Sequence, residues 1–223
     1  MTINFEKVSF NAGETEIIKD INIELSQSKI AIIGNNGSGK STFLRLINGL
    51  LLPTSGDVSV DGRLTSKHAK YIRRKVGMIF QNPEHQIIMP TVAEDLAISL
   101  KQFKLTKDEI KIRVEEILSH FSLSHLRDSN AYTLSGGEKQ LLAIAGVLII
   151  KPLYLLFDES TALLDYKNKR WFMNLLNNLK QKIIFVTHDL QLVENFDRAI
   201  VMHNGKIFYD GKVNLAIKEY LEL

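Results

Sequence analysis

The stretch GNNGSGKS, residues 34–41, limits the possible folds of this chain more than any other part of the sequence. It matches the pattern G-x-x-x-x-G-K-[ST] and directly follows Lys29–Ile33, an apolar run typical of a buried strand. A helical pattern then runs from Lys40 to Leu50 and stops before Pro53. A strand that turns through glycines into a helix presents backbone N–H groups and a helix N-terminus to a phosphate.

This loop predicts a nucleoside triphosphate site with Mg²⁺. Lys40 is expected to reach the β- and γ-phosphates, and the Ser41 hydroxyl is expected to ligate the metal. A glycine-rich turn without a ligand is the alternative, but a chance match is expected in only about one chain in a hundred of this size. The predicted nucleotide-binding residues are Gly34, Asn35, Asn36, Gly37, Ser38, Gly39, Lys40, Ser41 and Thr42.

A second acidic element is needed at such a site, and LYLLFDE, residues 153–159, supplies one. An apolar strand here would deliver Asp158 to the edge of the sheet where ligands bind, and we expect Asp158 to hold Mg²⁺. Glu159 follows directly and is predicted to polarise the attacking water. The alternative is a strand that simply ends in acidic residues.

Two further polar residues follow predicted strands. His188 comes after Ile183–Val186 and is a candidate donor to the γ-phosphate, while Gln81 comes after Val76–Phe80 and is a candidate ligand of Mg²⁺ and the water. Each signal is weak alone, because a polar residue in a loop explains it equally well.

The order of strands and helices predicts a mostly parallel sheet with a small antiparallel sheet attached. The first sixty residues contain mainly strand patterns, including Ile3–Phe10 and Ile17–Leu25. Strands then alternate with helical patterns, which is typical of α/β proteins, and Val213–Leu221 is predicted to be an amphipathic helix. A helical period extends from Thr91 to Phe121.

Composition excludes several classes of function. The chain has 223 residues and no cysteine, so it has neither a disulfide framework nor a zinc–thiolate site. A net charge of +3 gives no support for nucleic-acid binding, and six scattered histidines give little for a metal centre. The longest apolar run, Leu141–Ile150, is much shorter than the roughly 20 residues of a membrane-spanning helix, and the first residues do not resemble a signal peptide.

The stretch LSGGEKQ, residues 134–140, places a serine and two glycines before a long apolar helical pattern. Locally, Ser135 is predicted to be the N-cap of that helix. Together with GNNGSGKS, Gln81, LYLLFDE, the segment Leu163–Asp165 and His188, it resembles the ATPase subunits of ABC transporters in motif order, over essentially all 223 residues.

The resemblance implies one ABC-type nucleotide-binding domain over residues 1–223 with the P-loop NTPase fold. It would contain a mostly parallel central sheet with helices on both faces, an N-terminal antiparallel β subdomain, and an inserted helical subdomain at about residues 83–150. It also implies ATP hydrolysis by a head-to-tail dimer, and two intact half-sites favour a homodimer. In that dimer Ser135, Gly136 and Gly137 would bind the γ-phosphate held by the partner, and Asp165 would connect the two sites.

A narrower resemblance is to the energy-coupling factor (ECF) importers, carried by FQNPEHQI at residues 80–87 and TVAEDLA at residues 91–97. It implies a membrane coupling subunit that contacts the chain near Pro83–Ile88, a substrate-binding membrane subunit, and a peripheral position at the cytoplasmic face of a bacterial membrane. The short chain is most similar to the ATPase of a biotin module. A cobalt or nickel ECF importer, a soluble non-transport ABC ATPase and a nucleotide sensor are the alternatives.

Four positions depart from the family pattern, and one of them is Leu141, which stands where arginine is common. Ala12 stands where an aromatic residue usually stacks on adenine, and Phe10 or Phe5 is the expected substitute. Glu138 stands where the signature usually has glutamine, and Ser160 replaces the proline that usually follows the catalytic glutamate.

Overall fold

Alternating apolar residues at the N-terminus form one strand of a four-stranded sheet in the computed structural model, which describes residues 2–161 and 164–223. The strand order is β2 (Thr15–Leu25), β1 (Ile3–Ala12), β4 (Ser55–Val60) and β5 (Arg63–Leu64), and each neighbouring pair is antiparallel. The period of two places Ile3 and Phe5 on the buried face. The predicted Leu163 lies outside the described residues.

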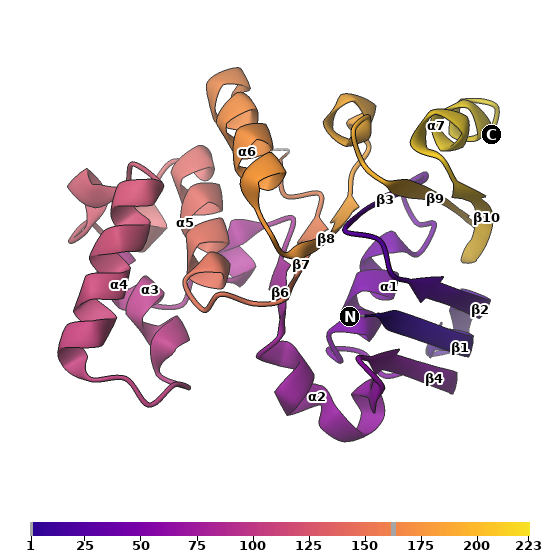
Figure 1. Ribbon diagram of the computed structural model, residues 1–223, viewed down its shortest axis with the longest axis horizontal. Helices are drawn as coiled ribbons and strands as arrows, with labels where there is room; N and C mark the ends of the chain where they lie inside the picture. Colours follow the sequence, from indigo (N-terminus) through magenta and orange to yellow (C-terminus); the bar gives the residue numbers. More distant parts are fainter. Residues whose placement is uncertain (1, 162–163) are drawn as a thin grey trace. The chain divides into compact units, whose positions relative to one another are not determined.

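A six-stranded sheet forms the second layer of this part of the chain (Figure 1). Its order is β10 (Lys206–Gly211), β9 (Arg198–His203), β3 (Lys29–Ile33), β8 (Lys182–Val186), β7 (Tyr154–Asp158) and β6 (Val76–Ile79). Strands β9, β3, β8 and β7 are mutually parallel, whereas β10 is antiparallel to β9. The carboxyl ends of β3, β7 and β8 therefore share one edge of the sheet.

Helix α1 (Lys40–Ile47) joins the two sheets through its buried face. The ring of Phe43 stacks on that of Phe5 with centroids 4.3 Å apart. The helix ends before Gly49, whose φ of 68° lies in the left-handed region that glycine adopts without strain. The predicted end at Leu50 was therefore too late. Helix α7 (Val213–Leu221) packs on β9 and has its predicted bounds.

The chain divides into two compact units. The first unit comprises residues 1–78, 153–159 and 181–223, and the second comprises residues 79–152 and 160–180. The second unit is helical and contains the whole of the predicted helical segment at residues 83–150. Its helices are η1 (Pro83–His85), α3 (Val92–Leu100), α4 (Lys107–His120), η2 (Ser124–Leu126), η3 (Ala131–Thr133), α5 (Gly136–Leu148) and α6 (Tyr166–Asn178).

The predicted α/β fold class is confirmed, with local differences. The helical period between Thr91 and Phe121 forms two helices, α3 and α4, and each begins with its own threonine-capping box. Helix α2 (Thr65–Arg73) was not predicted, because its sequence TSKHAKYIR buries only Thr65 and Ile72. Within the described residues, no helix is long and apolar enough to cross a membrane.

Candidate nucleotide-binding site

Glycines fix the shape of the loop between β3 and α1. Gly34 has a φ of 152°, and a Cβ atom at this position would lie 2.2 Å from the carbonyl oxygen of Met202. Gly39 is the N-cap of α1 with a φ of 99°. A side chain at either position would strain the loop or displace its neighbours, which explains why the sequence has glycine at both.

The Lys40 side chain folds back along this loop. Its Nζ donates hydrogen bonds to the carbonyl oxygens of Gly34 and Asn35 at 2.8 and 2.9 Å. Burial lowers the pKa of the Lys40 ammonium, and the nearby carboxylates of Glu159 and Asp158 act in the opposite direction. The cation thus lies inside the loop, where it can exchange two backbone carbonyls for phosphate oxygens.

Ser41 and Asp158 come from distant parts of the chain and are in contact. The Ser41 hydroxyl donates to Oδ1 of Asp158 at 2.8 Å, and only 2% of Asp158 is exposed. Burial raises the pKa of Asp158, while the hydrogen bond from Ser41 and the charge of Arg45 oppose that shift. A hydroxyl beside a carboxylate is an oxygen donor set that suits Mg²⁺, so these residues fit the predicted metal.

Glu159 and His188 lie at the ends of the neighbouring strands β7 and β8. His188 Nδ1 is 3.5 Å from Oε2 of Glu159, and the Glu159 backbone N–H donates to the Val186 carbonyl at 3.0 Å. Glu159 has a φ of 48°, which is uncommon for a residue with a Cβ atom. Backbone of this kind occurs at functional sites, although Lys7 and Asp20 adopt it outside the predicted site.

The predicted site residues that remain outside the phosphate loop belong to the second unit. Gln81 is exposed after β6, and Asp165 is the N-cap of α6, where Oδ1 accepts the N–H of Asn168 at 2.7 Å. Ser135 is the N-cap of α5, as predicted, and Gly136 and Gly137 form the first turn of that helix. The structure therefore brings Lys40, Ser41, Asp158, Glu159 and His188 together in the first unit.

Two residues change the sequence-based picture of the site. Phe5 is 1% exposed and stacks on Phe43, so the prediction that it could replace the adenine-stacking aromatic was wrong. Phe10 is partly exposed near the end of β1 and stays a candidate. Arg45 was not singled out from the sequence, although its position one helical turn after Ser41 was a usable signal.

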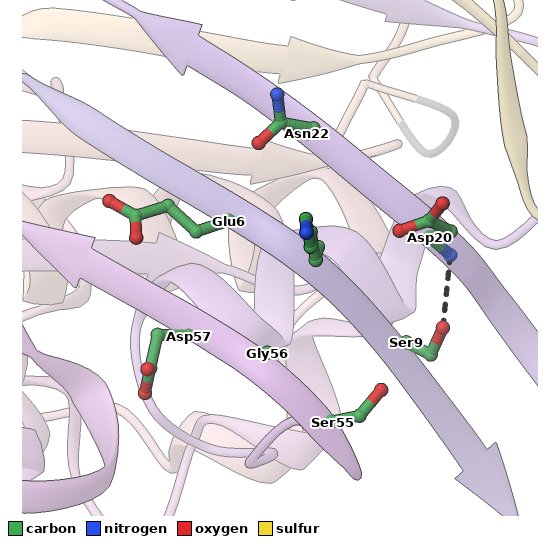
Figure 2. A pocket seen from close by; sticks show the side chains of 8 residues that line it. Glu6, Ser9, Asp20, Asn22, Ser55, Gly56 and Asp57 are labelled. Carbon is green, nitrogen blue, oxygen red and sulfur yellow. Dashed lines mark hydrogen bonds between the residues drawn. The ribbon is translucent and has the colours of Figure 1, made fainter.

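A separate pocket of about 770 Å³ opens on the antiparallel sheet (Figure 2). Strands β1, β2 and β4 supply all its lining residues, and Ser9 Oγ accepts the N–H of Asp20 at 2.9 Å. Three carboxylates and one lysine line it, so its charge disfavours phosphate. Its lining residues are Glu6, Lys7, Ser9, Asp20, Asn22, Ser55, Gly56 and Asp57, none of them a predicted site residue.

Comparison with known proteins agrees with this geometry. Residues 18–162 match the ABC transporter family. The chain belongs to the ABC transporter ATPase family. An ABC transporter ATP-binding protein of Bartonella henselae is 50% identical over 219 residues, covering 98% of this chain and 97% of the relative. The biotin transport ATP-binding protein BioM of Rhizobium etli is 41% identical, covering 100% and 99%. The ECF transporter ATP-binding protein EcfA1 of Halalkalibacterium halodurans is 36% identical, covering 96% and 80%.

Solved structures of ABC ATPases have the same fold. CbiO1 from Clostridium perfringens, described as part of the transporter complex CbiONQ, has a TM-score of 0.83 at 32% identity, covering 98% of this chain and 92% of that one. The ATP-binding cassette MJ0796, solved as a dimer bound to ADP and phosphate, has a TM-score of 0.85 at 28% identity, covering 95% and 98%. This chain is thus an ABC ATPase whose substrate is ATP.

Proposed function

We propose that this chain is the ATP-hydrolysing subunit of an ECF importer for biotin. It would act with membrane subunits at the cytoplasmic face of a bacterial membrane. The cluster of Lys40, Ser41, Asp158 and Glu159 supports hydrolysis, since it combines a phosphate-binding cation, a metal-binding pair and a base. The observation that carries the choice of biotin is the similarity to BioM along the whole length of both chains.

The phosphate loop would bind ATP through its backbone N–H groups and the N-terminus of α1. Lys40 would leave the carbonyls of Gly34 and Asn35 for the β- and γ-phosphates. Ser41 and Asp158, together with Gln81, would hold Mg²⁺, which neutralises charge on the phosphate oxygens. Phe10 is our candidate for contact with adenine, because Phe5 is buried.

Glu159 would accept a proton from the water that attacks the γ-phosphate. Its side chain is 12% exposed, so the base is largely shielded from solvent. His188, whose side chain is 62% exposed, can donate to the γ-phosphate while it stays next to Glu159. Lys40 and His188 would then stabilise the negative charge that moves onto the transferred group.

A second copy of the chain would complete each site. Ser135, Gly136 and Gly137 of one copy would bind the γ-phosphate on the other, and Asp165 would connect the two sites. Within one copy Ser135 and Gly136 are exposed, as this role requires. ATP would therefore join the two copies, and its hydrolysis would release them.

The membrane coupling subunit would contact the loop Pro83–Ile88, and a second membrane subunit would bind the transported substrate. Ile88 is 60% exposed on a firmly held loop, because Oδ1 of Asp95 accepts the backbone N–H groups of Ile88 and Met89 at 2.8 and 3.0 Å. The loop is tied to α5, since Glu84 pairs with Lys139 at 2.6 Å and Gln86 donates to the carbonyl of Ala143 at 2.8 Å. A partner that displaces this loop would therefore also displace α5, the helix that begins at Gly136 in LSGGEKQ.

Glu159→Gln tests the catalytic assignment. We expect ATP hydrolysis to fall at least about a hundredfold, which is the lower range for loss of a general base. The variant should form a dimer with ATP in light scattering, because the nucleotide is bound but not cleaved. Glu14→Gln, on the exposed β1–β2 turn, is the control and should hydrolyse ATP normally. Normal hydrolysis by Glu159→Gln would exclude Glu159 as the base.

Uptake of labelled biotin tests the transport assignment. Cells that make the chain with its membrane partners should accumulate biotin, and Glu159→Gln should abolish that uptake. Labelled cobalt and nickel are measured in the same cells. Metal uptake without biotin uptake would favour the metal importers, and the absence of any membrane partner in a mild-detergent pull-down would favour a soluble ATPase.

A further inference from the structure

The Ser135 hydroxyl is already engaged within its own chain. It donates to Oε2 of Glu138 at 2.6 Å, and the backbone N–H of Ser135 donates to the same oxygen at 2.8 Å. In return Ser135 Oγ accepts the N–H of Glu138 at 3.3 Å. These bonds form a capping box, in which the hydroxyl proton is directed toward a carboxylate.

Glu138 is a charged group at neutral pH. The hydrogen bonds from the Ser135 hydroxyl and backbone hold the pKa of its carboxyl below the usual range. Its negative charge therefore lies next to the hydroxyl that is proposed to bind a γ-phosphate. To donate to that phosphate, Ser135 must leave its carboxylate acceptor, and the carboxylate must then face another anion. Both changes oppose closure of the dimer.

We propose that the negative charge of Glu138 weakens the ATP-bound dimer. This inference rests on the proposed function, in which Ser135 acts on ATP held by a second copy. The physical basis is charge, since glutamine at the same position could form a similar capping box without repelling phosphate. Glu138 is thus a residue that sets the affinity of the ATP-bound dimer.

The chain contains a matched control for this charge. Thr91 and Glu94 form the same box at the start of α3: the Thr91 hydroxyl and N–H donate to Glu94 at 2.8 and 3.2 Å, and Thr91 accepts from the Glu94 N–H at 3.3 Å. Glu94→Gln removes an equal charge from a capping box with the same three hydrogen bonds, in a helix with no proposed contact to nucleotide. Any general effect of weakening a capping box will appear in both variants.

The experiment measures the ATP-dependent dimer of the full chain by analytical ultracentrifugation. The background is Glu159→Gln, which is expected to block hydrolysis. Adding Glu138→Gln should tighten each ATP-mediated contact about tenfold, or about 1.4 kcal/mol. A homodimer holds two such contacts, so its dissociation constant should fall about a hundredfold. Glu138→Asp, which keeps the charge, and Glu94→Gln should not tighten the dimer.

The outcomes separate this inference from the proposed function. If the Glu159→Gln dimer forms but Glu138→Gln leaves its dissociation constant unchanged or raises it, Glu138 does not weaken the dimer. The proposed ATP-dependent dimer is then still supported. Equal tightening by Glu94→Gln would also overturn the inference, because the effect would then be general. If no variant dimerises with ATP, the shared site itself is wrong and the inference fails with it.

Discussion

Gln140 offers a direct test of how this fold tolerates an unpaired polar group. The residue is on the buried face of α5 and is 0% exposed, and neither Nε2 nor Oε1 has a hydrogen-bond partner among residues 2–161 and 164–223. A buried amide without partners costs about 1–3 kcal/mol. Methionine has a similar length, and its helix propensity is close to that of glutamine. Gln140→Met should therefore raise the free energy of unfolding by about 1–3 kcal/mol.

Thermal unfolding followed by circular dichroism measures this effect. For a chain of this size each kcal/mol corresponds to about 2–4 °C, so Tm should rise by between about 2 and 12 °C. Gln86→Met is the matched control on the same helix interface, because the Gln86 amide donates to the Ala143 carbonyl at 2.8 Å. It should lose about 1 kcal/mol instead. A lower Tm for Gln140→Met would show that its amide is paired in solution and would refute the reasoning.

Two further substitutions test the first unit. Asp158→Asn should abolish hydrolysis yet stabilise the nucleotide-free fold by about 1 kcal/mol at pH 7, since it removes a buried charge. Burial raises the pKa of Asp158, so the native protein loses stability as pH rises toward and through that raised pKa. The difference in denaturation midpoint between Asp158→Asn and the native protein should therefore shrink in acid. Tyr154→Phe should cost about 1.5–3 kcal/mol in urea denaturation, because the buried hydroxyl donates to Oδ1 of Asp61 at 2.6 Å. An unchanged midpoint would show that this bond contributes nothing.

The phosphate loop was predictable because its signal is local. Strand, glycines and helix follow one another within a few residues, and each has a separate physical requirement. The position of Lys40 was not predictable, because its hydrogen bonds to Gly34 and Asn35 depend on how the loop folds without a nucleotide. The sequence predicted Ser41 and Asp158 as Mg²⁺ ligands from the oxygen atoms of their side chains. Their 2.8 Å contact depends on how the strands pair in the sheet, which the sequence does not show.

The wrong assignment of Phe5 could have been avoided from the sequence. The same alternation that predicted the strand puts Ile3 and Phe5 on one face, and a face shared with isoleucine is expected to be buried. Helix α2 is a different case. Its residues are mostly polar, so no apolar period was visible in the sequence, and the helix buries only Thr65 and Ile72.

In the part of the chain that the structure describes, most of the buried polar groups without a hydrogen-bond partner lie in or next to the predicted site motifs. Among the described residues, four side chains have buried polar atoms without a partner. Two of them lie within predicted motifs, Ser38 in the phosphate loop and Gln140 in LSGGEKQ, and a third, Ser160, directly follows Glu159. Packing alone would select against such groups, since each costs about 1–3 kcal/mol. A bound ligand or a second copy that supplies partners would offset part of that cost, and binding to the folded state would then stabilise it. For Ser38, which lies in the phosphate loop, a bound nucleotide would supply the missing partner and so stabilise the folded chain.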